Sequence, residues 1–203
     1  LIKIMSNFIG NKRLPMLIID SPNVVKDRNM FSARGAAILG LRMFGRDCIY
    51  ALNENMELNL PLVEEFIEKH KDENMLIFGF TFMVWQHLYS KLKDLNVKLN
   101  LPNAYLVTGG GWKKLVSLNI SNDDFRKALK DQCGIGHFVD HYGMVEQTGC
   151  IYAQCECGHL HASIYSDVIP RRANDFSVCD IGEKGIIQVV SVLPHSYPGH
   201  SLL

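Results

Sequence analysis

Residues 104–113, Ala-Tyr-Leu-Val-Thr-Gly-Gly-Gly-Trp-Lys, decide the fold class that we predict for this chain. An apolar run ends at Thr108 and passes directly into the glycine triplet Gly109, Gly110 and Gly111. A run of this kind bounded by glycine predicts a strand that opens on a loop. Residues without a Cβ let backbone amides come within contact distance of a flat or anionic ligand. A flexible turn that needs only positive φ is the alternative.

Strand and helix patterns alternate on both sides of this stretch. Apolar runs predict strands over residues 14–20, 48–52, 75–80, 104–108 and 137–142. Helical spacing predicts helices over residues 30–44, 60–70, 82–95 and 121–133, the last with an N-cap cluster at 121–123. Repeated βα units of this length favour an α/β fold with a mostly parallel sheet flanked by helices.

The pattern changes after Tyr142. Residues 151–152, 160–169 and 186–193 are β-branched runs separated by turns, with no helical stretch between them. We therefore expect an α/β subdomain over 1–149, followed by the start of a smaller, antiparallel β part over 150–203.

The composition excludes several classes of protein. With 203 residues, of which 47% are hydrophobic, the chain can bury the core of one globular unit. The chain has 21 Lys plus Arg residues and 21 Asp plus Glu residues. It therefore carries no excess positive charge that would favour binding to nucleic acid. No apolar run approaches the ~20 residues of a membrane span. The six cysteines are too scattered for a disulfide scaffold, so we expect a cytoplasmic protein.

A second loop, at the end of the predicted strand 137–142, also carries unusual residues. Residues 140–149 read Asp-His-Tyr-Gly-Met-Val-Glu-Gln-Thr-Gly. A tyrosine face can stack on a purine, a carboxylate can hold Mg²⁺ against phosphate oxygens, and a nearby acceptor can take an adenine amino proton. In open parallel sheets, ligands bind at the carboxyl ends of the strands. The two loops therefore predict a nucleotide site.

The second loop resembles a known signature. Residues 142–146, Tyr-Gly-Met-Val-Glu, resemble the Tyr-Gly-x-Thr-Glu signature of the adenylate-forming enzymes, which include acyl-CoA synthetases, peptide-synthetase adenylation domains and firefly luciferase. Residues 105–113 and 196–203 resemble the acyl-protein synthetase family, the fatty-acid-activating component of the bacterial luminescence fatty acid reductase and its relatives. Residues 158–169 are similar to a stretch of phenylacetate-CoA ligases. The likeness covers most of the chain, and its specific part is the second half.

This resemblance implies a ligase that uses ATP and Mg²⁺. Such an enzyme joins a carboxylic acid, here a fatty acid, to AMP and then passes the acyl group to a thiol. The acceptor is a protein cysteine or CoA, and a reductase is a further implied partner. The implied fold is a fragment of the large domain of an adenylate-forming enzyme, with residues 1–149 as its nucleotide-binding subdomain.

The resemblance also assigns roles to residues at the matching positions. The glycine triplet would line the adenine pocket, Asp140 would meet the adenine amino group, and Tyr142 would stack on the ring. Glu146 is the implied catalytic residue, which holds Mg²⁺ through phosphate. The implied cofactor-binding residues are Gly109, Gly110, Gly111, Asp140, His141, Tyr142, Gly143 and Met144. Phe80 and Trp112 are the implied contacts for the acid, although ordinary core packing also explains the aromatic segment around Phe80.

The chain departs from the superfamily pattern at Val145, where the superfamily has a threonine that contacts the α-phosphate. Either that contact is missing, or Gln147 or Thr148 supplies it. We expect the phosphate loop upstream of residue 1, and the ribose-binding aspartate and the C-terminal domain downstream of residue 203. The isolated chain is then inactive. A nucleotide-binding or scaffold module without chemistry is the alternative reading.

A cysteine and histidine cluster raises the question of zinc. Cys155, Cys157, His159 and His161 lie within seven residues. Thiols and imidazoles are zinc ligands, but structural zinc sites usually use two separated pairs. The spacing therefore favours unligated thiols and leaves zinc as the alternative.

Overall fold

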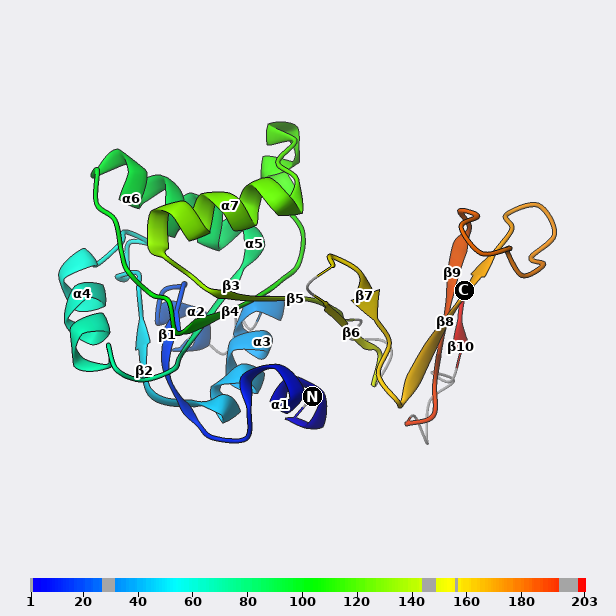
Figure 1. The fold of residues 1–203 in the computed structure, drawn as a ribbon, viewed down its shortest axis with the longest axis horizontal. Coiled ribbons are helices and arrows are strands. Elements are labelled where there is room, and N and C mark those ends of the chain that lie inside the picture. Colours follow the sequence, from blue (N-terminus) through cyan, green and yellow to red (C-terminus); the bar gives the residue numbers. More distant parts are fainter. Residues whose placement is uncertain (1, 27–31, 144–148, 156, 194–200) are drawn as a thin grey trace. The chain divides into compact units, whose positions relative to one another are not determined.

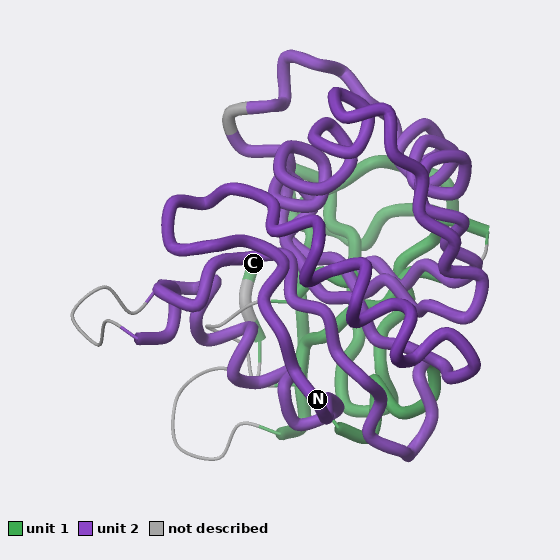
Figure 2. Tube along the Cα trace, turned by 90° about the vertical axis from the view of Figure 1, so that its left-hand side faces the viewer, with its two compact units in different colours: residues 1–8, 141–203 green, residues 9–140 purple. Residues whose placement is uncertain are grey.

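The computed structural model describes residues 2–26, 32–143, 149–155, 157–193 and 201–203. It divides into two compact units (Figure 2). Unit 2 comprises residues 9–140, and unit 1 comprises residues 1–8 and 141–203. The assignment of nucleotide binding to 1–149, with a β-rich part over 150–203, stays a prediction.

The strands are β1 (Leu14–Ile18), β2 (Gly45–Tyr50), β3 (Met75–Phe80), β4 (Ala104–Gly109), β5 (His137–Gly143), β6 (Ile151–Gln154), β7 (Leu160–His161), β8 (Ser166–Arg171), β9 (Ile186–Ser191) and β10 (Ser201–Leu202). The helices are α1 (Ile2–Ile9), α2 (Asn23–Lys26), α3 (Ala33–Leu41), α4 (Leu60–Lys69), α5 (Thr81–Met83), α6 (Ser90–Asp94) and α7 (Asn122–Cys133). Shorter helical turns are η2 (Arg42–Phe44) and η4 (Lys113–Leu118), both of the 3₁₀ type, and the π-helix η3 (Val84–Tyr89).

The larger sheet has the strand order β2-β1-β3-β4-β5-β6-β7. β1 pairs in parallel with β2 and β3, and β3 pairs in parallel with β4. β5 pairs antiparallel with β6, and β6 with β7. A second sheet, β10-β9-β8, is antiparallel. The predicted α/β fold with a smaller antiparallel part is therefore confirmed.

Helices cover both faces of the sheet in unit 2 (Figure 1). Leu17, Ile77 and Leu106 belong to one buried cluster together with Leu88 of η3 and Leu129 of α7. Side chains alternate between faces along a strand, so the equally buried neighbours in β1 face the opposite layer. Burial on both faces explains why these strands are continuous apolar runs.

Local sequence signals place α7. The Ser121 hydroxyl accepts a hydrogen bond from the Asp124 amide at 3.1 Å, so Ser121 caps the helix as predicted. Gly134, with a φ of +66°, ends the helix in the left-handed conformation.

The helix predicted over 82–95 forms as three consecutive pieces, α5, η3 and α6. The middle piece is a six-residue π-helix. Apolar spacing does not distinguish a π turn from an α turn over so short a window, so the sequence pattern did not predict the π-helix. The sequence patterns also did not predict α1 or the 3₁₀ turn η4.

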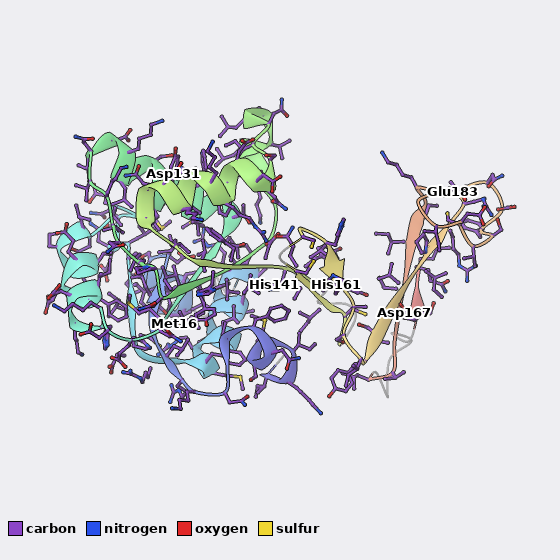
Figure 3. All side chains as sticks on the ribbon, viewed as in Figure 1. Met16, Asp131, His141, His161, Asp167 and Glu183 are labelled. Atoms are coloured by element: carbon purple, nitrogen blue, oxygen red, sulfur yellow. The ribbon has the colours of Figure 1, made fainter. Side chains whose placement is uncertain are left out.

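The loop that joins β8 to β9 in unit 1 is held by one arginine. Arg172 donates from Nε to Glu183 Oε1 and from Nη2 to Asp180 Oδ2, each at 2.8 Å. Figure 3 shows Glu183 in this loop. The ion pairs are exposed, so they order the loop and contribute little to global stability.

Within the described part of the chain, the structure contains no helix with both the length and the apolar character needed to cross a bilayer.

Leu106→Ala tests the assignment of the core. Leu106 is fully buried in the cluster described above, so the substitution leaves a cavity. We expect the free energy of unfolding to fall by about 2–5 kcal/mol, measured by chemical denaturation. The control is Leu95→Ala, at a leucine that is 55% exposed, where a change within about 0.5 kcal/mol is expected. Equal effects of the two substitutions would contradict the assignment.

Candidate functional site

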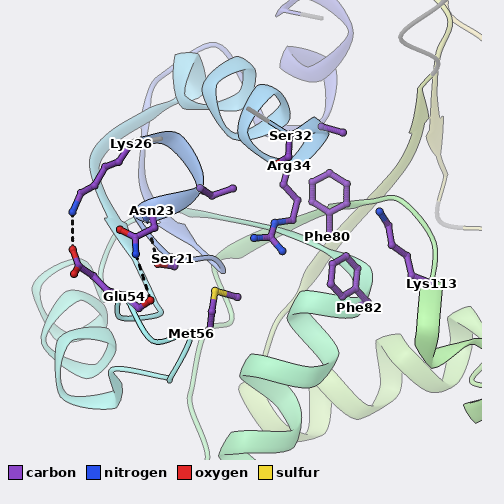
Figure 4. Close-up of a pocket in the computed structure, with 12 residues that line it drawn as sticks. Ser21, Asn23, Lys26, Ser32, Arg34, Glu54, Met56, Phe80, Phe82 and Lys113 are labelled. Carbon is purple, nitrogen blue, oxygen red and sulfur yellow. Dashed lines mark hydrogen bonds and ion pairs between the residues drawn. The ribbon is translucent and has the colours of Figure 1, made fainter. Parts of the chain in front are cut away.

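A cavity of about 690 Å³ opens in unit 2 at the edge where the parallel strands end (Figure 4). All the pairs among β1, β2, β3 and β4 are parallel, so the segments that follow these strands leave the sheet at the same edge. The cavity wall includes Ser21 after β1, Glu54 and Met56 after β2, Phe80 at the end of β3, and Lys113 after β4.

The cavity combines aromatic walls with cationic groups. Figure 4 shows the Arg34 side chain reaching into the cavity from α3. Phe80, Phe82 and Lys113 lie to one side of it, and Met56 lies to the other. An amphiphilic ligand with an anionic group matches this lining.

Arg34 is held by a buried carboxylate. Its Nε lies 3.0 Å from Asp20 Oδ2, at ion-pair distance but not aligned as a hydrogen bond. The Asp20 side chain is only 3% exposed. Burial raises the pKa of Asp20, and the Ser21 amide and Arg34 oppose that rise. The pair fixes the direction of the guanidinium and offsets its charge.

The start of α3 faces the same cavity. Ser32 caps the helix, and its hydroxyl accepts a hydrogen bond from the Gly35 amide at 3.3 Å. Ser32, Ala33 and Arg34 all line the cavity. The partial positive charge of a helix N-terminus adds to the preference for an anion there.

His87 of the π-helix lies close to this charge cluster. Its Nδ1 is 3.1 Å from the carbonyl oxygen of Met56. Burial lowers the pKa of His87, against the opposing effects of that carbonyl and of Asp20. The neutral imidazole is therefore favoured at neutral pH.

The glycine triplet forms the end of β4 and the turn after it. Gly110 has a φ of +71°, and a Cβ there would lie 2.7 Å from the Phe80 ring. A Cβ on Gly111 would meet none of the described atoms within 4 Å. The Thr81 hydroxyl donates to the Gly110 carbonyl at 3.0 Å and fixes the turn. The space at Gly111 leaves its backbone accessible to a ligand.

Asp140, in the middle of β5, lies beside the end of β4. The Thr108 hydroxyl donates to Asp140 Oδ1 at 3.0 Å. The hydrogen bond brings the residue before the glycine triplet and the predicted adenine contact into direct contact within unit 2. The role of Asp140 toward adenine stays a prediction.

The remaining residues of the predicted nucleotide site lie outside unit 2. His141, Tyr142 and Gly143 are the last residues of β5 and belong to unit 1. The Tyr142 ring is stacked on Tyr152 with centroids 6.3 Å apart, and Tyr142 is 51% exposed. The predicted residues Met144 and Glu146, together with Val145, Gln147 and Thr148, fall outside the described residues.

The two predicted acid contacts have different surroundings. Phe80 lines the cavity. Trp112 is partly buried and packs edge-on against Trp85 and Phe125, with ring centroids 5.5 and 5.7 Å apart. Contact of either residue with a substrate stays a prediction.

Sequence reasoning missed most of the cavity residues. Asp20 and Ser21 follow a strand directly, so the rule that ligands bind at strand carboxyl ends could have identified them. Arg34 carries no such signal, because it lies within a helical pattern.

The cysteine and histidine cluster forms the hairpin between β6 and β7. The Cys155 amide donates to the His159 carbonyl at 2.9 Å. Among the described residues, no group of three or more His, Cys, Asp or Glu side chains is placed to hold a metal ion. The His159 amide and then the His161 ring lower the pKa of the Cys155 thiol to about 7.

A family model described as "Acyl-protein synthetase, LuxE" matches residues 1–203. Among curated proteins, no sequence matches the chain.

Several solved structures share the fold. The long-chain-fatty-acid-CoA ligase FadD1 from Archaeoglobus fulgidus has a TM-score of 0.56 and 14% identity, over 92% of this chain and 36% of that one. ATP-bound MatB from Rhodopseudomonas palustris has a TM-score of 0.57 and 12% identity, over 92% and 33%. The luciferase-like enzyme from the nonluminescent mealworm Zophobas morio has a TM-score of 0.55 and 20% identity, over 94% and 42%. The chain therefore spans about a third to two fifths of their length, and at these identities the likeness shows the fold alone.

Gly110→Ala and Gly111→Ala form a matched pair of tests for the glycine turn. We expect Gly110→Ala to lower the free energy of unfolding by about 1 kcal/mol or more, because of its positive φ and the Phe80 ring. Gly111→Ala should change stability less, because its Cβ would meet no described atom within 4 Å, and it should weaken ATP binding if the predicted nucleotide site is correct. Denaturant melts and ATP titrations measure the two effects. Similar stability losses for both variants would refute the described geometry.

Alkylation tests the state of Cys155. Because the pKa of this thiol is lowered to about 7, more thiolate is present at neutral pH than for an ordinary cysteine. We expect iodoacetamide to label Cys155 faster than Cys157, with a rate that rises through a midpoint at about pH 7. His161→Phe should move the midpoint upward. Peptide mass spectrometry across a pH series measures the rates. An unchanged midpoint in His161→Phe would contradict the contact between the His161 ring and the Cys155 thiol.

Proposed function

We propose that this chain, which belongs to the acyl-protein synthetase (LuxE) family, takes part in the ATP-dependent activation of a carboxylic acid. The acid is joined to AMP as an acyl-adenylate, and the acyl group then passes to a thiol. Family membership confirms the resemblance to the acyl-protein synthetase family predicted from residues 105–113 and 196–203. The activity, the substrates and the partners are our proposals.

The observation that carries the proposal is the position of the cavity. It lies at the carboxyl ends of parallel strands, where open α/β sheets bind ligands, and it adjoins the glycine turn at Lys113. Its aromatic and aliphatic walls suit the apolar body of an acid, and its cations suit a carboxylate. We assign the acid to this cavity, with a fatty acid as the preferred class.

The nucleotide is assigned to the glycine turn and to Asp140. The open space at Gly111 fits the approach of a flat or anionic group, since a Cβ there meets no described atom within 4 Å. The hydrogen bond from Thr108 fixes the Asp140 carboxylate, which can accept an adenine amino proton. The proposed roles of His141, Tyr142, Gly143 and Met144 toward the nucleotide rest on the family resemblance alone.

Bound Mg²⁺ would offset negative charge on the phosphates of ATP. Glu146 is the proposed residue that holds it, and the carboxylate is of the type that Mg²⁺ prefers. The chain's own contribution to the reaction is then mainly to position the acid and the nucleotide.

The thiol acceptor is a protein cysteine or CoA, and a reductase is the proposed partner that takes up the activated acyl group. All six cysteines of this chain are free. Unpaired cysteines are typical of a reducing compartment, so we place the reaction in the cytoplasm.

Exchange of labelled pyrophosphate into ATP, measured on the full-length protein with a panel of carboxylic acids, tests the proposal. We expect acid-dependent exchange that is lost on chelation and restored by Mg²⁺. Glu146→Ala should reduce the exchange by about 100-fold or more, the usual effect of removing one charge-stabilising group. Glu64→Ala, at an exposed glutamate on α4, is the matched control and should leave the exchange unchanged.

Exchange that persists in Glu146→Ala would remove Glu146 from the reaction. Wild-type protein that binds ATP and shows no exchange with any acid would favour a nucleotide-binding module without chemistry. Val145, which stands where the superfamily has a phosphate-contacting threonine, is the feature that favours this second candidate.

A further inference from the structure

Lys113 is the first residue after the glycine triplet and Trp112, and its backbone is unusual. It has a φ of +49°, a left-handed conformation that residues with a Cβ rarely adopt. The Leu115 amide donates to the Trp112 carbonyl at 2.8 Å and closes the turn around it. Strained backbone of this kind persists where the surrounding structure imposes it, and it often marks functional sites.

The turn directs the Lys113 side chain toward the aromatic wall of the cavity. Its Nζ lies 5.6 Å from the centre of the Phe82 ring and 6.0 Å from the centre of the Phe80 ring. Figure 4 shows the three side chains on the same side of the cavity. The ammonium group therefore stands at the end of the cavity that adjoins the glycine turn.

The other cations of the cavity wall already have carboxylate partners. Lys26 Nζ is 2.9 Å from Glu54 Oε1, and Arg34 Nε is 3.0 Å from Asp20 Oδ2. Within the described ranges, no carboxylate lies within ion-pair distance of Lys113. Among the described residues of the cavity lining, Lys113 is thus the cation whose charge is not balanced by a carboxylate.

One unbalanced cation beside aromatic walls selects a particular kind of ligand. A polyphosphate would need several cations or many polar donors, whereas a ligand with one anionic end and an apolar body needs one cation and apolar contacts. An alkyl or aryl carboxylate has this form.

We infer that Lys113 binds the carboxylate of the acid and holds its apolar body against Phe80 and Phe82. The inference rests on the proposed function and adds the residue that recognises the acid. Lys113 acts on the bound acid before the reaction, by fixing the carboxylate at the end of the cavity nearest the proposed nucleotide site.

The test uses two variants of Lys113 and one matched control. Lys113→Met removes the charge and keeps most of the length, whereas Lys113→Arg keeps the charge. Lys71→Met, at a lysine outside the cavity lining, removes the charge of a lysine that is already paired with Glu68. Thermal melting confirms that all three variants fold. The probes are decanoic acid and decan-1-ol, which differ in the carboxylate.

For the wild-type protein we expect decanoic acid to bind at least about tenfold more tightly than decan-1-ol, a ratio that one charge-assisted contact supplies. Lys113→Met should abolish this preference, and Lys113→Arg and Lys71→Met should retain it. In pyrophosphate exchange, Lys113→Met should raise the KM for the acid about tenfold and leave the KM for ATP within about twofold.

Two outcomes would overturn the inference. A rise in the KM for ATP with no change for the acid would place a phosphate group at Lys113. Unchanged acid binding in Lys113→Met would leave the lysine without a role in recognition. Neither outcome removes the proposed function, which fails only when the wild-type protein shows no exchange with any acid.

Discussion

Parallel pairing of β1, β2, β3 and β4 is the constraint on which the rest of unit 2 depends. Parallel strands need crossover connections, and the helices in those connections bury both faces of the sheet. The same pairing sends every strand out of the sheet at one edge, where Ser21, Glu54, Phe80 and Lys113 follow or end the strands. The position of the cavity is therefore a consequence of topology, and its chemistry depends on the residues next to each strand end.

The ion pair between Asp20 and Arg34 joins the buried sheet to the cavity. Burial alone would disfavour the Asp20 carboxylate, as the direction of its pKa shift indicates. The Ser21 amide and Arg34 oppose that effect. Buried pairs add little net stability, but removing one partner leaves an uncompensated charge. The pair is therefore best understood as a device that orients Arg34, and it leaves the charge preference of the cavity to Lys113.

The order of the strands and of the longer helices in unit 2 could be predicted because local signals mark these elements. The buried run 75–80 has the length of a strand, and Ser121 caps a helix with its own side chain. The cavity depends on pairings that only the fold creates, such as Arg34 with Asp20, and sequence spacing gives no sign of them. The left-handed backbone of Lys113 is also hidden, since lysine has no preference for that conformation. Phe80 was identified through family resemblance, and residues 144–148 fall outside the described residues.

Solved structures with 12–20% identity can share this fold because its requirements lie mainly in the backbone and in buried volume. Gly79 is an example: an added Cβ would lie 2.8 Å from Val84 and 2.9 Å from Ile19, so the strand and the following helix need a glycine there. No such requirement applies to the exposed Lys113 at the cavity edge. Residues that follow the strands can change without loss of the sheet, and such changes can alter which ligand binds. The identity of the ligand must therefore be argued from the cavity lining of this chain, because likeness of fold leaves that lining undetermined.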